Sequence, residues 1–123
     1  MPQYWIAGAM VQNEDVIDTL VEHSFWYADS EAAQELIPRI QMGDRLAIKR
    51  MRGPNDPHHI AIRAIGEAQA TKAYHYLHET FTLIYVKWIR LAQERIVPIH
   101  NWMGALHRPY LEADPRIAGV FSL

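Results

Sequence analysis

The stretch Met42–Gln69, MGDRLAIKRMRGPNDPHHIAIRAIGEAQ, decides the fold that this sequence predicts, because it holds two strand patterns and the turns that bound them. The pair Gly43-Asp44 is a typical turn signal. Behind it, Leu46 and Ile48 alternate with the residues between them, as in a strand with one buried face. The sequence therefore predicts a strand that opens directly after a Gly-Asp turn.

A wide loop separates this strand from its return partner. The segment Gly53–Pro57 contains two prolines, and proline lacks the N–H that a central strand donates to its neighbour. Ile60 and Ile62 then resume the alternation, which predicts the return strand. Gly66 interrupts that pattern, and we expect a β-bulge or a sharp bend there.

The rest of the chain predicts short strands, with two helices near the start. A strand is expected at Gln3–Ala9, then a helix that begins at Asn13, then a helix capped by Asp29 or Ser30 and stopped by Pro38. Ala70–Thr82 is predicted as a loop or short helix, and later strands are predicted at Leu83–Arg90, Glu94–Ile99 and Ile117–Phe121. This order favours the α+β class: a small curved β-barrel of about five or six strands, with short helices after the first strand.

The composition indicates one globular domain over residues 1–123. Half of the residues are hydrophobic (50%), and a chain of this length buries about two-thirds of its unfolded surface, which is enough for one core. Cysteine is absent, so no disulfide forms, which fits a reducing compartment. No signal-peptide pattern opens the sequence, and no run approaches the ~18 apolar residues of a membrane span. We therefore expect a soluble, cytoplasmic protein with no membrane partner.

The charges are unevenly distributed along the chain. Residues 1–35 hold seven acidic residues and no Lys or Arg, whereas residues 36–123 hold seven acidic and twelve basic residues. Between Arg45 and Arg63 there are five basic residues and one acid, Asp56. This predicts a locally positive face that can meet a phosphate backbone, although the whole-chain charge of −2 argues against avid non-specific binding. The alternative is that these are ordinary charges on solvent-facing strand positions.

No motif for metal binding, cofactor binding or catalysis occurs in the chain. His58 and His59 are adjacent, so in a strand their rings point to opposite faces. His75 and His78 are three residues apart, whereas the zincin motif needs two histidines four residues apart. A nucleophile elbow, a Walker loop and a Gly-x-Gly-x-x-Gly fingerprint are all missing from the sequence. We expect no metal, no cofactor and no catalytic residues, and the sequence favours a binding protein over an enzyme.

The aromatic residues are the more informative feature. Four tryptophans and six tyrosines exceed what a small core needs, and aromatic faces stack on nucleobases. Trp5 and Trp88 fall inside strand patterns, which favours core packing. Trp26 and Trp102 fall in polar contexts, where a ligand pocket and core packing are both open.

Five motifs together resemble a known family: Tyr4-Trp5-Ile6, Phe25-Trp26, Ile40–Lys49 (IQMGDRLAIK), Ile60–Gly66 (IAIRAIG) and Val86-Lys87-Trp88. In this order they resemble a PUA-like domain, and more narrowly the EVE-like modules at the N-terminus of Mcr-type restriction GTPases. The resemblance spans most of residues 4–90. It implies a small curved barrel with helices packed at one end.

The resemblance also implies a function, which is recognition of a modified, for example methylated, base as part of a restriction or defence system. The base would flip into an aromatic-lined pocket. Ligand-binding roles fall on Trp26, Tyr27, Arg63, Trp88, Asn101 and Trp102, and phosphate-binding roles on Lys49, Arg50 and Arg52. This hypothesis predicts that Trp26→Ala abolishes ligand binding with little loss of fold.

The implied partner is nucleic acid, with DNA favoured over RNA, and a separate effector protein would act on what is bound. The resemblance gives no oligomeric state. Two alternatives stay open: an RNA- or nucleotide-binding PUA-like protein, and a small enzyme that acts on a nucleotide-like ligand in the same pocket.

Overall fold

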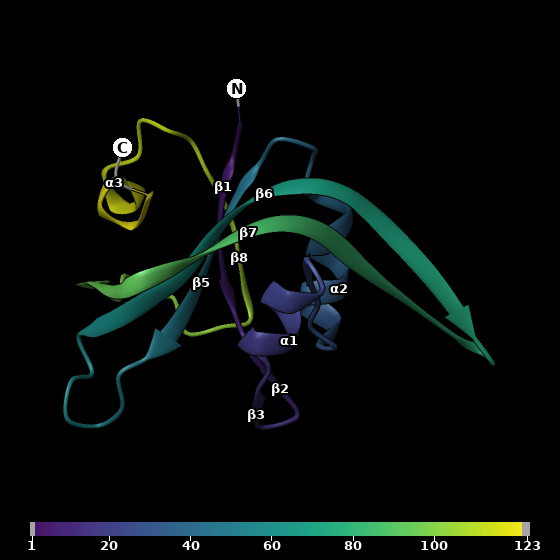
Figure 1. Cartoon of the computed structure of the whole chain (residues 1–123), viewed down its shortest axis with the longest axis horizontal. Helices are drawn as coiled ribbons and strands as arrows, with labels where there is room; N and C mark the ends of the chain where they lie inside the picture. Colours follow the sequence, from purple (N-terminus) through teal and green to yellow (C-terminus); the bar gives the residue numbers. More distant parts are fainter. Residues whose placement is uncertain (1, 122–123) are drawn as a thin grey trace.

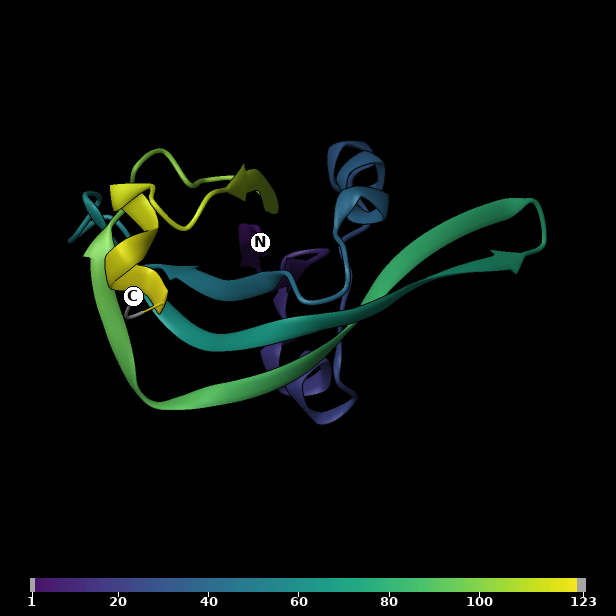
Figure 2. The same ribbon diagram turned by 90° about the horizontal axis from the view of Figure 1, so that it is seen from above.

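The computed structural model describes residues 2–121, apart from the side chains at positions 76, 108 and 109. A six-stranded sheet with the order β4-β7-β6-β5-β1-β8 curls into a half-barrel (Figures 1 and 2). This agrees with the small curved β fold that the sequence predicts. The strands are β1 (Tyr4–Gly8), β4 (Phe25–Trp26), β5 (Arg45–Met51), β6 (His59–Tyr76), β7 (Glu79–Pro98) and β8 (Leu106–Tyr110).

Short helices and one small hairpin complete the fold. They are β2 (Met10–Val11), β3 (Glu14–Asp15), α1 (Ile17–Glu22), α2 (Glu31–Leu36), the 3-10 turn η1 (Ile37–Arg39) and α3 (Pro115–Phe121). Most of them form the crossover from β1 to β5, which pair in parallel, because parallel neighbours need a long connection. Among the described residues, no helix has the length and apolar character needed to cross a membrane.

The sheet separates two hydrophobic cores. Successive strand residues point to opposite faces, so β1 sends Trp5 into one core and Ile6 into the other. Helices α1 and α2 cover the first core, and α3 covers the second. Strand β1 pairs with β5 and β8 along its edges, and the two cores bury both of its faces.

The Gly-Asp turn before β5 is confirmed, and its aspartate has a structural role. The buried carboxylate of Asp44 accepts hydrogen bonds from the amides of Gln3 (3.0 Å) and Gln41 (2.9 Å) and from Nε1 of Trp5 (3.0 Å). Gly43 has φ +90°, in the left-handed region that glycine tolerates. The turn therefore ties the start of β5 to the start of β1, two segments that are 39 to 41 residues apart.

The expected bulge does not lie at Gly66. The strand register is irregular at two other points instead, one before Gly66 and one after it. The β6–β7 register shifts between Ile62 and Ala64 and again between Ala68 and Thr71. A Cβ at Gly66 would lie 2.6 Å from Val86 Cγ1, closer than real atoms approach. Glycine is needed at this position because side chains of β7 cross directly over the backbone.

The prediction of a loop or short helix at Ala70–Thr82 is wrong. Strands β6 and β7 form one long hairpin that turns at Leu77 (φ +56°), and its outer part extends away from the rest of the molecule (Figures 1 and 2). The two strands predicted at Leu83–Arg90 and Glu94–Ile99 are accordingly one strand, β7. The outer hairpin is exposed on both faces, so no buried side leaves an apolar alternation in its sequence.

The prediction of a final strand at Ile117–Phe121 is also wrong, because these residues belong to α3. Pro115 occupies the first position of this helix, where its missing N–H costs nothing. The carboxylate of Asp114 accepts from the amide of Arg116 (2.9 Å), and Ile117 and Val120 fill the second core from one helical face. The spacing of three residues between Ile117 and Val120 is typical of a helix, but in a stretch as short as Ile117–Phe121 it does not exclude a strand.

The two early helices are confirmed with one shift. Ser30 caps α2 by accepting from the amide of Ala33 (3.2 Å), as predicted. The first helix does not begin at Asn13, which has φ +66° in the β2–β3 turn. It begins at Ile17, whose amide donates to the carboxylate of Asp15 (3.1 Å).

Candidate ligand-binding cleft

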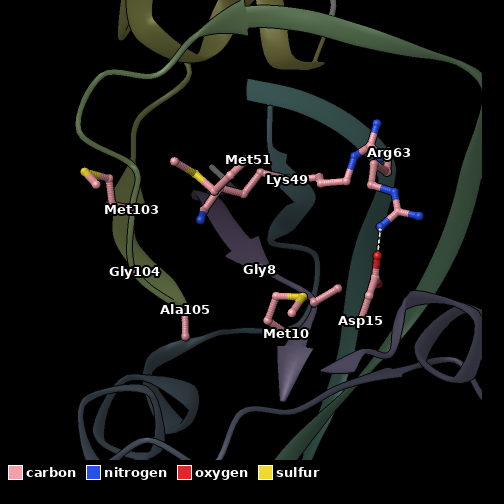
Figure 3. Close-up of a pocket in the computed structure, with 11 residues that line it drawn as sticks. Gly8, Met10, Asp15, Lys49, Met51, Arg63, Met103, Gly104 and Ala105 are labelled. Carbon is pink, nitrogen blue, oxygen red and sulfur yellow. Dashed lines mark hydrogen bonds and ion pairs between the residues drawn. The ribbon is translucent and has the colours of Figure 1, made fainter. Parts of the chain in front are cut away.

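A cleft of about 480 Å³ opens where β1 ends and the chain turns into β2 (Figure 3). This volume lies within the range of about 300–1,000 Å³ typical of small-ligand pockets. Five segments line it: Gly8–Met10, Asp15, Lys49–Met51, Arg63 and Met103–Ala105. They come from β1–β2, β3, β5, β6 and the turn before β8, and we call the site the Lys49 cleft.

Three methionines stand around the Lys49 cleft, each on a different element. In Figure 3, Met51 lies at the top of the cleft and Met10 at the bottom, and Met103 lies at the left, opposite Arg63. All three are exposed. A thioether side chain is flexible and polarizable, so it adapts to the shape of an apolar ligand and makes favourable contacts with aromatic rings. A group of exposed apolar side chains around a hollow is typical of a binding surface.

A strand irregularity brings the basic residues to the cleft. The β5–β6 register shifts between Ile48, which lies opposite Ala64, and Lys49, which lies opposite Ile62. Arg63 is left as the extra residue on β6, and the β6–β7 register shifts at the same point. A β-bulge re-aims the side chain at which it occurs and is frequent beside binding sites.

The two arginines of the cleft are already paired with carboxylates. Arg63 donates from Nη1 to Asp15 Oδ2, and its buried Nε lies 3.3 Å from Glu94 Oε2 without the geometry of a hydrogen bond. Arg50 Nη2 lies 2.6 Å from the other oxygen of Glu94. Burial of Asp15 acts to raise its pKa, but hydrogen bonds from Arg63 and from the Ile17 amide outweigh it, so the pKa is below its usual value. These ion pairs link β3, β5, β6 and β7 beside the cleft, and they balance the charges of the two arginines.

Lys49 differs from the arginines because it has no such partner. The residue is only 7% exposed, yet its side chain makes no hydrogen bond or ion pair with another residue that the structure describes. Burial lowers the pKa of Lys49 below its ordinary value. Lysine is almost never buried without a partner, so Lys49 is the feature of the cleft that most requires an explanation.

His107 on β8 lies close enough to Lys49 for the lysine charge to affect the pKa of its imidazole. Burial and the charge of Lys49 both lower the pKa of His107. Its Nε2 accepts a hydrogen bond from the amide of Gly104 (3.0 Å), which requires an unprotonated nitrogen. A neutral His107 therefore supports the turn that carries Met103.

Three of the residues that the sequence singled out come together in this cleft: Lys49, Arg50 and Arg63. The fourth basic residue, Arg52, lies in the loop after β5 and pairs with Asp56 (2.9 Å). Three of the five basic residues in the predicted positive face, Arg50, Arg52 and Arg63, are therefore paired with carboxylates.

Two of the three tryptophans with predicted ligand-binding roles, Trp26 and Trp102, are packed into the cores. Trp26 is 0% exposed and donates from Nε1 to the carbonyl of Gly8 (2.8 Å). Trp102 is 1% exposed and donates from Nε1 to the hydroxyl of Tyr110 (2.9 Å). Neither indole lines the Lys49 cleft. Trp26 contacts it indirectly, through the hydrogen bond to the carbonyl of Gly8, which is a lining residue.

The remaining predicted ligand residues lie elsewhere. Tyr27 packs edge-to-face on Phe81 of β7, with ring centroids 6.0 Å apart. Trp88 is half-buried and donates from Nε1 to the carbonyl of Phe25 (2.9 Å). Asn101 is exposed, with φ +64°, in the turn before Trp102. These side chains do not share one site with the basic residues.

Sequence reasoning missed the methionines, Asp15 and His107 as parts of the site. Met10 and Met103 are nearly a hundred positions apart, and no local pattern connects them. Asp15 falls within the helix that the sequence predicts to begin at Asn13, whereas it ends the β2–β3 hairpin beside Arg63. The surplus of acids before residue 36 and of bases after it was the one available signal.

Comparisons with known proteins do not identify the chain: no family profile matches it, and no curated protein is significantly similar. Within residues 2–121, no group of three or more histidine or carboxylate side chains is arranged to hold a metal ion. Function must therefore be inferred from the geometry and chemistry of the Lys49 cleft.

Proposed function

We propose that this protein is a nucleic-acid-binding module of the PUA-like, EVE-like type that receives one extruded base in the Lys49 cleft. The observation that carries the proposal is the combination in one hollow of methionine walls with a lysine that lacks a carboxylate partner. The curled six-stranded sheet and the motifs of residues 4–90 support the family. Enzymes and readers that need access to a single base take it out of the stack in this way.

In the proposed complex, Met10, Met51 and Met103 contact the faces of the base, in place of the aromatic walls that the sequence suggested. Lys49 contacts the phosphate or a polar edge, because it is the cleft cation with no carboxylate partner among the described residues. Phosphate contacts set the register of the strand, and contacts to the base set its identity.

The apolar walls favour a base that carries an added methyl group. Burying one methyl contributes about 0.8 kcal/mol, which corresponds to an affinity difference of about fourfold. The expected discrimination is thus modest, as it is for any apolar pocket that distinguishes ligands by one methyl group.

The experiment titrates fluorescently labelled oligonucleotides, plain and methylated, and compares Met103→Glu with Met42→Glu. Met103 (69% exposed) lines the cleft and Met42 (77% exposed) does not, so both variants should fold alike. We expect the glutamate at position 103 to weaken binding at least about tenfold by charge repulsion, and the control to bind as the wild type does.

Equal losses in the two variants, or no binding to any DNA, would overturn the assignment of this cleft. Binding to structured RNA with no binding to DNA would favour the alternative of an RNA-binding protein with the same fold.

A further inference from the structure

The side chain of Lys49 has the surroundings of a chemical nucleophile as well as those of a ligand anchor. We propose that the Lys49 amine forms a Schiff base with an aldehyde that is held between the methionines of the Lys49 cleft. The inference does not depend on nucleic-acid binding, because any aldehyde with an apolar body of suitable size would fit the same geometry.

The first support is the absence of a counter-charge. Arg50 and Arg63 share Glu94, and Arg63 also holds Asp15, so the carboxylates beside the cleft are engaged. No described carboxylate contacts Lys49. A charged amine in this position has little contact with bulk water and no described carboxylate to balance its charge.

The second support is the balance of charges on the elements around the cleft. Asp15 from β3 and Glu94 from β7 balance Arg63 on β6 and Arg50 on β5, and His107 on β8 is neutral. Burial lowers the pKa of Lys49 and so increases the neutral, nucleophilic fraction of the amine. Lysines that form Schiff bases in proteins are activated by the same kind of desolvation.

The chemistry needs no further reagent. The nitrogen lone pair attacks the carbonyl carbon, and the π electrons of the C=O bond move to oxygen, which takes one of the two amine protons to give a carbinolamine. The nitrogen lone pair then expels the hydroxyl, which leaves as water with the second amine proton, and a C=N bond remains. One amine and one aldehyde thus give one imine and one water, with no change in oxidation state.

Two sources of the aldehyde fit this site. One is a free small aldehyde with an apolar body. The other is a nucleic-acid sugar that has lost its base, which carries an aldehyde in its open form and would join this proposal to the preceding one. The experiment has an arm for each source.

The first arm treats the folded protein with benzaldehyde and cyanoborohydride at about pH 7.5 and maps the benzylated lysines by mass spectrometry. The chain has three lysines, and Lys72 and Lys87 are exposed internal controls. Burial leaves a larger neutral fraction of the Lys49 amine than an exposed lysine has, so we expect Lys49 to react at least about tenfold faster than either control. The preference should disappear in urea, because it arises from the fold.

Labelling of Lys72 and Lys87 at the same rate as Lys49, or faster, overturns the proposal, including the case in which Lys49 stays charged and only binds anions. The second arm replaces benzaldehyde with an oligonucleotide that contains one abasic site. Preferential reaction of Lys49 over Lys72 and Lys87 in either arm supports the proposal, and the arm in which it occurs identifies the source. Plain-oligonucleotide binding tests the proposed function separately.

Discussion

Lys49 places an ionisable side chain where its neighbours along β5, from Leu46 to Ile48, are buried and apolar. A residue that lowers stability in this way is typical of functional sites, where activity is retained at the expense of the fold. Lys49 is buried and has no described carboxylate partner, which suggests a nucleophile. The same two features predict that replacing Lys49 changes the free energy of unfolding by a measurable amount.

Replacement of Lys49 by methionine should stabilise the protein, because it removes a buried amine that has no partner and keeps an unbranched side chain. We expect a gain of about 1 kcal/mol, which raises Tm by roughly 3–5 °C in a chain of this size. Thermal unfolding followed by circular dichroism measures it, with Lys72→Met as the exposed control. A decrease in Tm larger than that of the control would contradict the interpretation.

The pH dependence of this difference has a defined sign. The pKa of Lys49 is lower in the folded state than its ordinary value of 10.5, so the unfolded chain binds more protons between the two values. The cost of Lys49 is therefore present below the folded pKa and disappears as the pH rises towards 10.5. Urea unfolding should show the wild type and Lys49→Met converging between neutral pH and about pH 10.

Trp26 illustrates how burial reverses a prediction. Since it is 0% exposed, Trp26→Ala should lower the free energy of unfolding by about 3–5 kcal/mol, whereas a pocket wall would have tolerated the change. Urea titration of Trp26→Ala and Trp26→Phe distinguishes the two cases. The phenylalanine variant keeps much of the volume and loses chiefly the hydrogen bond to Gly8, so its loss should be nearer 1 kcal/mol. A folded, fully stable alanine variant would return Trp26 to the list of ligand residues.

At the scale of elements, α3 depends on a capping residue that is easily tested. The pKa of Asp114 is lowered to about 2 by hydrogen bonds from the side chain and amide of Arg116. Because this folded value is below the ordinary 3.8, the contribution of Asp114 to stability is complete above that pH and is lost as the pH falls towards 2.

The variant Asp114→Asn should therefore be less stable than the wild type at neutral pH, and the difference should shrink as the pH falls from about 4 to 2. Chemical denaturation at several pH values measures it. The exposed Glu112→Gln is a suitable comparison, since its carboxylate does not cap the helix. A difference between wild type and Asp114→Asn that is constant with pH would contradict the capping role.

The long β6–β7 hairpin shows why some elements escape sequence reasoning. Its outer strands pair residue by residue, with Tyr74 stacked on Phe81 (5.8 Å) and His75 bonded to Thr80 (2.9 Å). Gln34 of α2 holds its root through both the carbonyl and the amide of Thr82. Cross-strand contacts of this kind stabilise a ribbon without a buried face, and a periodicity search detects only buried faces.

At the scale of the whole molecule, acidic residues near the start of the chain form ion pairs with arginines from the rest of it. Asp15 pairs with Arg63 and Asp18 pairs with Arg90, across 48 and 72 residues. Part of the positive face that the sequence suggested is thus neutralised by carboxylates of the same chain, which is consistent with its net charge of −2.

This charge arrangement predicts a weak salt dependence of nucleic-acid binding. If Lys49 alone neutralises a phosphate, the slope of log K against log salt concentration should be about −0.9 on duplex DNA. Fluorescence anisotropy at several salt concentrations measures it. A slope of about −3 or steeper would mean that Arg50, Arg52 and Arg63 leave their carboxylates and bind the backbone, which would contradict the ion-paired wall.

Local sequence determined the elements whose signals act over a few residues: the Gly43-Asp44 turn with its strand, the proline loop behind it, and the Ser30-capped helix. Turn and cap chemistry depends on near neighbours, so these features can be read without the fold. The tertiary structure alone decided which tryptophans are buried, that the last apolar run is a helix, and that Met10, Lys49 and Met103 surround one cleft. Burial and cleft composition depend on residues that are distant in sequence, and their contacts exist only after β1 has paired with both β5 and β8.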